Sequence, residues 1–238
     1  MAAARTLWGE LAGRGEAFDD GVTVVVEPRS QLCPDGFVGV VSIGAGVLAT
    51  VPTQELAAPV TDVLTAVPVR EATTVTAFEA AFDVRGLLGP AALAYVDAAS
   101  FRPAPRRQGW RVEWVEPGSH RLTAFLAASP PEEAAESGLV DATSPVALLL
   151  DHDDVVITAC GWRPWLGRTA HLGILTAPHA RGRGAGRAGA SAAVARVLAA
   201  GLLPQWRARV PASRRVASTV GFIEVGSQLS LQITPRRR

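Results

Sequence analysis

Hydrophobic and polar positions along the chain predict alternating strands and helices in both halves. In the N-terminal half, β-branched runs predict strands at Val22–Val26 and Val38–Ser42, and helical spacing predicts helices at Gln54–Val67, Thr74–Phe82 and Ala91–Ala98. Gly89-Pro90 is expected to break the chain before the last of these helices. Gly44-Ala45-Gly46 follows a strand without continuing as a dinucleotide fingerprint, so a simple turn is favoured. No catalytic constellation stands out in this half.

The C-terminal half alternates more clearly. Its predicted strands are Val146–Leu150, Val155–Cys160, His171–Thr176 and Gln205–Val210, followed by a strand pair, Phe222–Val225 and Gln228–Ile233, around Gly226. Its predicted helices are Pro131–Ser137, Ala185–Ala200 and Ala212–Thr219, with Gly201 suited to the end of the second. This order implies a mixed sheet with helices on its faces.

A seam between two domains is expected at Phe101–Gln108, where two prolines and three arginines interrupt both patterns. We therefore predict an N-terminal α/β subdomain over residues 1–105 and a second domain over residues 106–238.

Composition narrows the class of protein. Hydrophobic residues make up 48% of the chain and charged residues 19%, which is a globular composition. The formal net charge is +1, so no long-range field attracts nucleic acid or membrane. Cys33 and Cys160 are too few for a disulfide framework or a zinc site. No apolar run is long enough for a membrane span and the first residues do not form a signal peptide, so a soluble, cytoplasmic protein is expected.

The stretch from His171 to Leu198 carries the clearest chemical signal. After a strand and a turn at Pro178, the chain reads Arg181-Gly182-Arg183-Gly184-Ala185-Gly186 and enters a helix at once. Glycines let a backbone approach a ligand closely, and free amides at a helix start attract anions. The loop therefore predicts a pyrophosphate site, to which Arg181, Arg183 and Arg187 would add charge-assisted contacts.

This loop resembles the pyrophosphate-binding signature of the GNAT acetyltransferase superfamily, Arg/Gln-x-x-Gly-x-Gly/Ala, with Arg181, Gly184 and Gly186 at the fixed positions. Ser213 and Gly221-Phe222 resemble the family's second conserved block. The resemblance covers about residues 110–233. It implies an α/β fold with a GNAT-like mixed, mostly antiparallel twisted sheet flanked by helices, here with an N-terminal α/β extension or subdomain.

The resemblance also implies a function. The expected activity is direct transfer of acetyl from acetyl-CoA, as cosubstrate and without a metal, to an amine, which is either a small molecule or a protein N-terminus. No nucleic-acid or membrane partner is expected, and a homodimer is left open. The alternative is a non-catalytic acyl-CoA-binding sensor or scaffold. The implied cofactor contacts are Ile174, Leu175, Thr176, Arg181, Gly182, Arg183, Gly184, Ala185, Gly186 and Arg187.

Two residues are catalytic candidates. His171 begins the central strand, where family members often place a catalytic Glu, and a neutral imidazole can act as general base at pH 7. The alternative is a histidine that only covers the sheet. Ser213 matches a serine that approaches the cofactor in relatives, although its position also suits a helix N-cap, which we favour slightly. The tyrosine that many relatives use as general acid is replaced by Ala217.

Other polar residues near the motif have weaker claims. Trp162 and Trp165 would line an acceptor site or pack in the core. Glu132, Glu133 and Glu136 would attract a cationic amine or form a solvated helix face. The run Asp151–Asp154 contains His152 and suggests a metal, but a solvated hairpin turn is strongly favoured.

Overall fold

The computed structural model describes residues 2–236 and divides the chain into two compact units. The first unit contains the chain up to Leu93 and again from Glu224, and the second contains Ala94–Ile223. Each unit has its own strands and its own hydrophobic core. Among residues 2–236, no helix combines the length and apolar character that crossing a bilayer requires.

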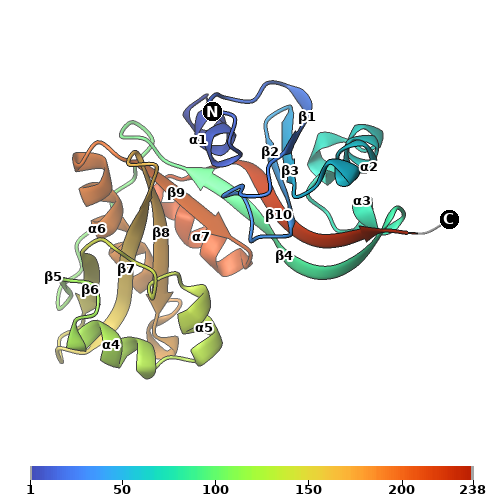
Figure 1. Cartoon of the computed structure of the whole chain (residues 1–238). Coiled ribbons are helices and arrows are strands. Elements are labelled where there is room, and N and C mark those ends of the chain that lie inside the picture. Colours follow the sequence, from blue (N-terminus) through green and yellow to red (C-terminus); the bar gives the residue numbers. More distant parts are fainter. Residues whose placement is uncertain (1, 237–238) are drawn as a thin grey trace. The chain divides into compact units, whose positions relative to one another are not determined.

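The first unit is built on five strands in the order β1-β3-β2-β10-β4 (Figure 1). Its elements are α1 (Ala2–Leu11), β1 (Gly21–Val26), β2 (Val38–Ile43), β3 (Gly46–Val51), α2 (Gln54–Ala66), the 3-10 helix η1 (Val69–Glu71), α3 (Thr76–Glu79), β4 (Phe82–Tyr95) and β10 (Ile223–Pro235). β1 is parallel to β3, whereas β2 is antiparallel to β3 and to β10. Leu56, Val60 and Leu64 of α2 bury the amphipathic face that its spacing predicted.

Two predictions in this unit were wrong. Ala91–Ala98 does not form a helix, because the chain passes Gly89-Pro90 within β4 and Ala91–Tyr95 completes that strand. Gly226 is not a turn between two strands but lies inside the single strand β10, opposite Ile43. A Cβ at Gly226 would lie 1.7 Å from the carbonyl oxygen of Ser42, so the glycine permits close strand approach.

The second unit has five strands in the order β9-β8-β7-β6-β5. Its elements are β5 (Arg111–Val115), α4 (His120–Ala127), α5 (Pro131–Glu136), β6 (Val146–Leu150), β7 (Val156–Trp165), β8 (Thr169–Thr176), the 3-10 helix η2 (Pro178–Ala180), α6 (Ala185–Ala199), β9 (Leu203–Ala208) and α7 (Pro211–Val220). Strands β5 to β8 are antiparallel neighbours, and β9 runs parallel to β8.

Helices cover both faces of this second sheet. Leu172 of β8 joins a core cluster with α6 and α7, including Val194 and Val220. On the opposite face, a Cβ at Gly173 would lie 2.5 Å from the Ser137 carbonyl oxygen, so the end of α5 packs directly on the middle of β8. Alternate residues of β8 therefore contact different helix layers, as the period of a strand requires.

The pairing of β8 with β9 is short. It extends only from Thr169 opposite Leu203 to His171 opposite Gln205, although β8 continues to Thr176. The second half of β8 therefore has β7 on one edge and no paired strand on the other.

The segment predicted as a domain seam belongs to the second unit. The Ala104 amide donates to Ser191 Oγ of α6, and the Arg102 amide donates to the Val220 carbonyl of α7. The C-terminal strand, which we placed in the second domain, pairs with β2 of the first unit. The domain division after residue 105 stays a prediction, since the compact units do not test whether either part folds alone.

Candidate cofactor and acceptor site

Backbone direction identifies the free edge of β8. The Ala177 amide donates to a carbonyl of β7, and backbone groups alternate between the two edges of a strand. Ile174 and Thr176 therefore direct their backbone groups away from β7, and the Thr176 carbonyl accepts a hydrogen bond from Arg181 Nε there. Because β9 pairs no further than His171, the Ile174 amide lies beyond the last paired residue. This amide can donate to an incoming carbonyl oxygen.

The glycine loop leads from β8 into α6 as the sequence suggested. Gly182 and Gly184 have φ of 73° and 85°, a left-handed conformation that favours glycine. Gly184 is the N-cap of α6, and no side chain caps the helix there. A Cβ at either glycine would meet no protein atom within 4 Å, so the outer side of the loop is open. The amides of Ala185, Gly186 and Arg187 form the first helical turn and favour an anion.

Arg181 contacts a carboxylate in this structure. Its guanidinium donates two hydrogen bonds to Glu133 of α5, and Arg209 after β9 pairs with Glu136 of the same helix. The two glutamates thus anchor α5 to the ends of β8 and β9. The sequence analysis weighed a solvated helix face against attraction of a cationic amine, and these partly exposed carboxylates pair with arginines on such a solvated face.

One residue on the loop was missed by the sequence analysis. Arg107, from the predicted seam, donates to the Arg183 carbonyl at 2.7 Å and lies over the Trp110 ring at 4.5 Å from its centroid. This contact ties the loop to the segment that precedes β5. No pattern around Arg107 indicated the contact, because it joins residues 76 positions apart.

His171 is held in a defined network on the face of the sheet that carries Gly173. Its Nδ1 lies 2.8 Å from Gln205 Oε1, and Gln205 Nε2 donates to the Tyr95 hydroxyl at 3.2 Å. With the amide in this orientation, Nδ1 carries the proton and Nε2 the lone pair. Trp165 stacks on the imidazole, with ring centroids 4.4 Å apart. Tyr95 is the last residue of β4 and belongs to the second unit. The sequence analysis identified neither Gln205 nor Tyr95 as a partner of His171.

The environment of His171 disfavours its charged form. Burial away from water, assisted by the charges of Arg207 and Arg163, lowers the pKa of His171 to about 3, and the hydrogen bond that Nδ1 donates to Gln205 opposes this only partly. The ordinary imidazole pKa is about 6.5, so the protein environment weakens His171 as the general base expected from the sequence. His171 is neutral at pH 7 and is a weak base.

Ser213 does not cap its helix. The N-cap of α7 is Val210, and Ser213 Oγ instead accepts a hydrogen bond from the indole nitrogen of Trp206 at 2.9 Å. The slight preference for capping was therefore wrong. Ala217, at the position where relatives carry a tyrosine, is buried in the core beside α6. Whether Ser213 approaches a cofactor stays a prediction.

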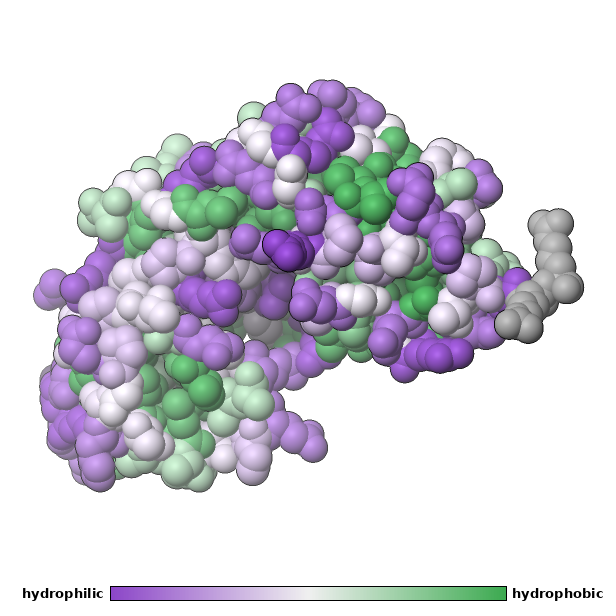
Figure 2. Space-filling view, viewed as in Figure 1, coloured by the Kyte–Doolittle hydropathy of each residue, from purple (hydrophilic) through white to green (hydrophobic). Residues whose placement is uncertain are grey.

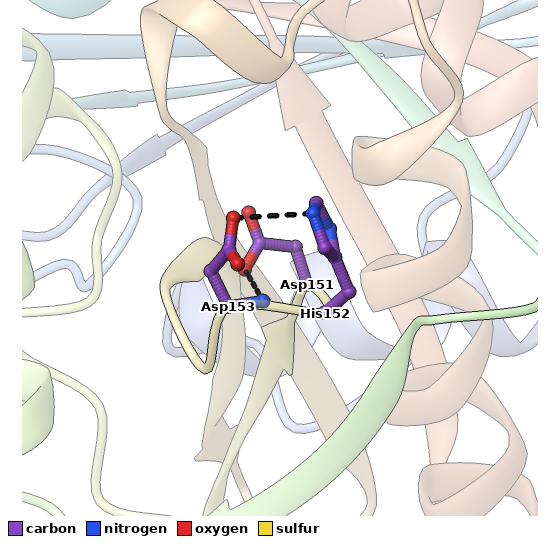
Figure 3. A group of neighbouring side chains, drawn as sticks. All are labelled: Asp151, His152 and Asp153. Atoms are coloured by element: carbon purple, nitrogen blue, oxygen red, sulfur yellow. Dashed lines mark hydrogen bonds and ion pairs between the residues drawn. The ribbon is translucent and has the colours of Figure 1, made fainter.

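The two tryptophans and the acidic turn named in the sequence analysis lie in different surroundings. Trp162 is buried in the core, whereas Trp165 lies against His171. In the β6–β7 turn, ligand atoms of Asp151, His152 and Asp153 lie within 4.8 Å of one another (Figure 3). Internal contacts account for this group, since Asp151 Oδ1 accepts the Asp153 amide and His152 pairs with Asp153. These interactions are those of the solvated turn that the sequence favoured.

A shallow hollow of about 640 Å³ in the first unit is lined in part by Ser42, Arg70, Glu224 and Ser227. The hydroxyls of Ser42, Ser227 and Thr73 bond to one another there.

Comparison with known proteins supports the fold. No protein-family model matches the chain, and no curated protein matches it. A GCN5-related N-acetyltransferase-like protein from Streptococcus suis is similar in structure, with a TM-score of 0.50 and 14% identity over 89% of this chain and 87% of that chain. A GNAT-family acetyltransferase from Colwellia psychrerythraea (TM-score 0.46, 14% identity, 64% of this chain) and a GCN5-related N-acetyltransferase from Kribbella flavida (TM-score 0.46, 15% identity, 66% of this chain) also match.

The chain spans 59% and 62% of the length of the Colwellia and Kribbella structures, respectively. The match to the Streptococcus suis protein, which extends over most of both chains, identifies the architecture. The chain has the GNAT-type acetyltransferase fold, a mixed and mostly antiparallel sheet flanked by helices, and this confirms the fold expected from the sequence.

Proposed function

We propose that the protein is an acetyl-CoA-dependent N-acetyltransferase that transfers acetyl directly to an amine. The observation that carries this proposal is the arrangement around β8. The Ile174 amide lies on the unpaired edge of the strand, and the glycine loop begins a few residues later and ends at the uncapped start of α6. A donor for a carbonyl oxygen and a site for a pyrophosphate thus follow one another along one strand edge, as an extended thioester cosubstrate requires.

The described residues fit this cosubstrate. Amides of Ala185, Gly186 and Arg187 would hold the pyrophosphate, and the open side of Gly182 and Gly184 leaves room for it. Ile174 N–H would bind the thioester carbonyl oxygen and stabilise the charge that forms on it. Acetyl-CoA supplies the acetyl group as a thioester. The amine lone pair forms the new C–N bond, the C–S bond breaks, and the thiolate leaves with the electron pair.

The acceptor must react as a neutral amine, and His171 is a poor acceptor of its proton. An alkyl ammonium has a pKa of about 10, far above the pKa of about 3 for His171, so proton transfer from the ammonium to this imidazole is strongly unfavourable. Neutral His171 would instead accept a hydrogen bond through Nε2 and orient the amine. The amine would reach this position in its neutral form, with its proton already lost to bulk solvent, and the proton released when the C–N bond forms passes to water.

Binding and turnover measured separately test the proposal. Calorimetry should show acetyl-CoA binding to the full chain, and a thiol reagent should detect CoA released in the presence of a panel of amines. Binding with CoA release supports an acetyltransferase. Binding of acetyl-CoA without release of CoA in the presence of any amine would favour the sensor or scaffold function. Ala217 is consistent with that alternative, because this buried alanine occupies the position expected for the general acid. Absence of binding would overturn both functions.

A further inference from the structure

The face of the sheet around His171 carries positive charge from two neighbouring strands. Arg163 of β7 lies directly opposite His171 in the β7–β8 register, so their side chains share one face. Gln205 lies opposite His171 on β9, and Arg207, two residues further, returns to the same face. Arg207 also lies over the Trp165 ring, at 5.9 Å from its centroid.

Carboxylates do not balance the charge at Arg163. Within the described range, Arg163 forms no ion pair or hydrogen bond, and Glu136 of the adjoining helix is paired with Arg209. Arg163 and Arg207 both lie close enough to His171 to disfavour a proton on its ring. The same field disfavours any second cation that approaches this face.

An acceptor amine must approach this face if His171 orients it, as our proposed function holds. A diamine or polyamine would bring a further positive charge towards two arginines. A molecule that bears a carboxylate or phosphate besides its amine would instead meet a guanidinium that pairs with either group in a bidentate manner.

We propose that the acceptor is an amine that also carries an anionic group, a carboxylate or a phosphate, bound by Arg163 with Arg207 beside it. This inference rests on the proposed function and names its substrate class.

Matched acceptors test the charge requirement. The panel contains β-alanine, 6-aminohexanoate and 2-aminoethyl phosphate, the neutral amides of the two amino acids, and 1,6-diaminohexane. We expect kcat/KM for the anionic amines to exceed that for the neutral amides by about tenfold or more, the contribution of a hydrogen bond to a charged group. The diamine should be the poorest acceptor. The two carboxylates and the phosphate distinguish the sources of the anion.

Variants locate the effect. Arg163→Gln should lower kcat/KM for the anionic amines by about tenfold, mainly through KM, and change that for the neutral amides by less than about threefold. Arg196→Gln is the matched control, since Arg196 is exposed on α6, on the other face of the sheet, and its loss should not change selectivity.

The same comparison is made by calorimetry on the protein saturated with CoA, titrated with 6-aminohexanoate and with its amide, so that the result does not depend on turnover. Preferential binding of the carboxylate that Arg163→Gln removes supports the inference. Equal affinities, equal kcat/KM values or a preference for the diamine would overturn it. A protein that does not bind acetyl-CoA would overturn the proposed function itself, and that outcome is recognised in the preceding titration with acetyl-CoA.

Discussion

The protonation of His171 should make the stability of the protein depend on pH in a way that a single substitution removes. Below its unfolded-state pKa of about 6.5, the unfolded chain binds a proton at this residue that the folded protein, with a pKa of about 3, does not bind. The stabilisation is fully present above about pH 6.5 and is lost progressively as the pH falls towards 3. At pH 5 the loss relative to pH 7 is about 2 kcal/mol.

This loss of stability at pH 5 does not depend on the exact pKa of His171 in the folded protein. At pH 5 a group with any pKa well below 4 is almost entirely neutral in the folded protein, so the loss depends only on the unfolded-state pKa. Burial, Arg207 and Arg163 all act in the same direction on His171, and a single hydrogen bond to Gln205 opposes them.

Urea unfolding at pH 7 and pH 5, followed by tryptophan fluorescence, measures the effect. The free energy of unfolding of the wild type should fall between the two pH values by about 2 kcal/mol more than that of His171→Gln. His152→Gln, which removes an exposed histidine from the β6–β7 turn, should behave like the wild type. The same pH dependence in wild type and His171→Gln would refute the reasoning. If the imidazole proton resonance assigned to His171 titrates near pH 6.5, His171 can again be considered as the general base.

Further substitutions test the cofactor site and its supports. Gly184→Ala should lower acetyl-CoA affinity by about tenfold or more. Gly201 lies at the other end of α6 with φ of 72°, so Gly201→Ala and Gly184→Ala should each cost about 1–2 kcal/mol of stability. Calorimetry should show that Gly201→Ala leaves acetyl-CoA affinity unchanged. Glu133→Gln should raise acetyl-CoA affinity by about two- to fivefold, because Arg181 is released from its ion pair, and a weaker affinity would contradict this. Ser213→Ala should cost about 1–3 kcal/mol in urea unfolding, since it leaves the buried Trp206 N–H without its acceptor, and an unchanged midpoint would exclude that role.

The sequence predicted the elements whose signals are local. Helices α2 and α6 carry long periodic or alanine-rich runs, and the glycine loop between β8 and α6 is a contiguous motif, so each was placed within a residue or two. Ala91–Tyr95 misled the analysis because alanine and leucine favour helices locally, whereas neighbouring strands impose the extended conformation on nearly buried residues. The conformation of this segment is therefore decided by strand partners that lie far along the chain and not by local propensity.

The site residues that were missed share this property. Gln205 and Tyr95 acquire their role only when β9 and the end of β4 come together at His171, and Gln205 reaches a hydroxyl 110 positions away. The depressed pKa of His171 likewise arises from burial first, and then from the charges of Arg207 and Arg163 on the two strands that flank β8. A single sequence can indicate that a histidine suits the chemistry. The charges that act on this histidine depend on which residues of the neighbouring strands lie opposite it, and the sequence alone does not indicate that pairing.

The short pairing between β8 and β9 has a consequence for amide hydrogen exchange. Most amides of a central strand are protected on both edges, but the amide of Ile174 lies in the middle of the sheet beyond the last residue that β9 pairs with. Its deuterium uptake should be fast for such a position in the free protein and slow once a thioester oxygen occupies it. Exchange at the Ile174 amide therefore reports whether a thioester oxygen is bound there, and the measurement needs no label on the ligand.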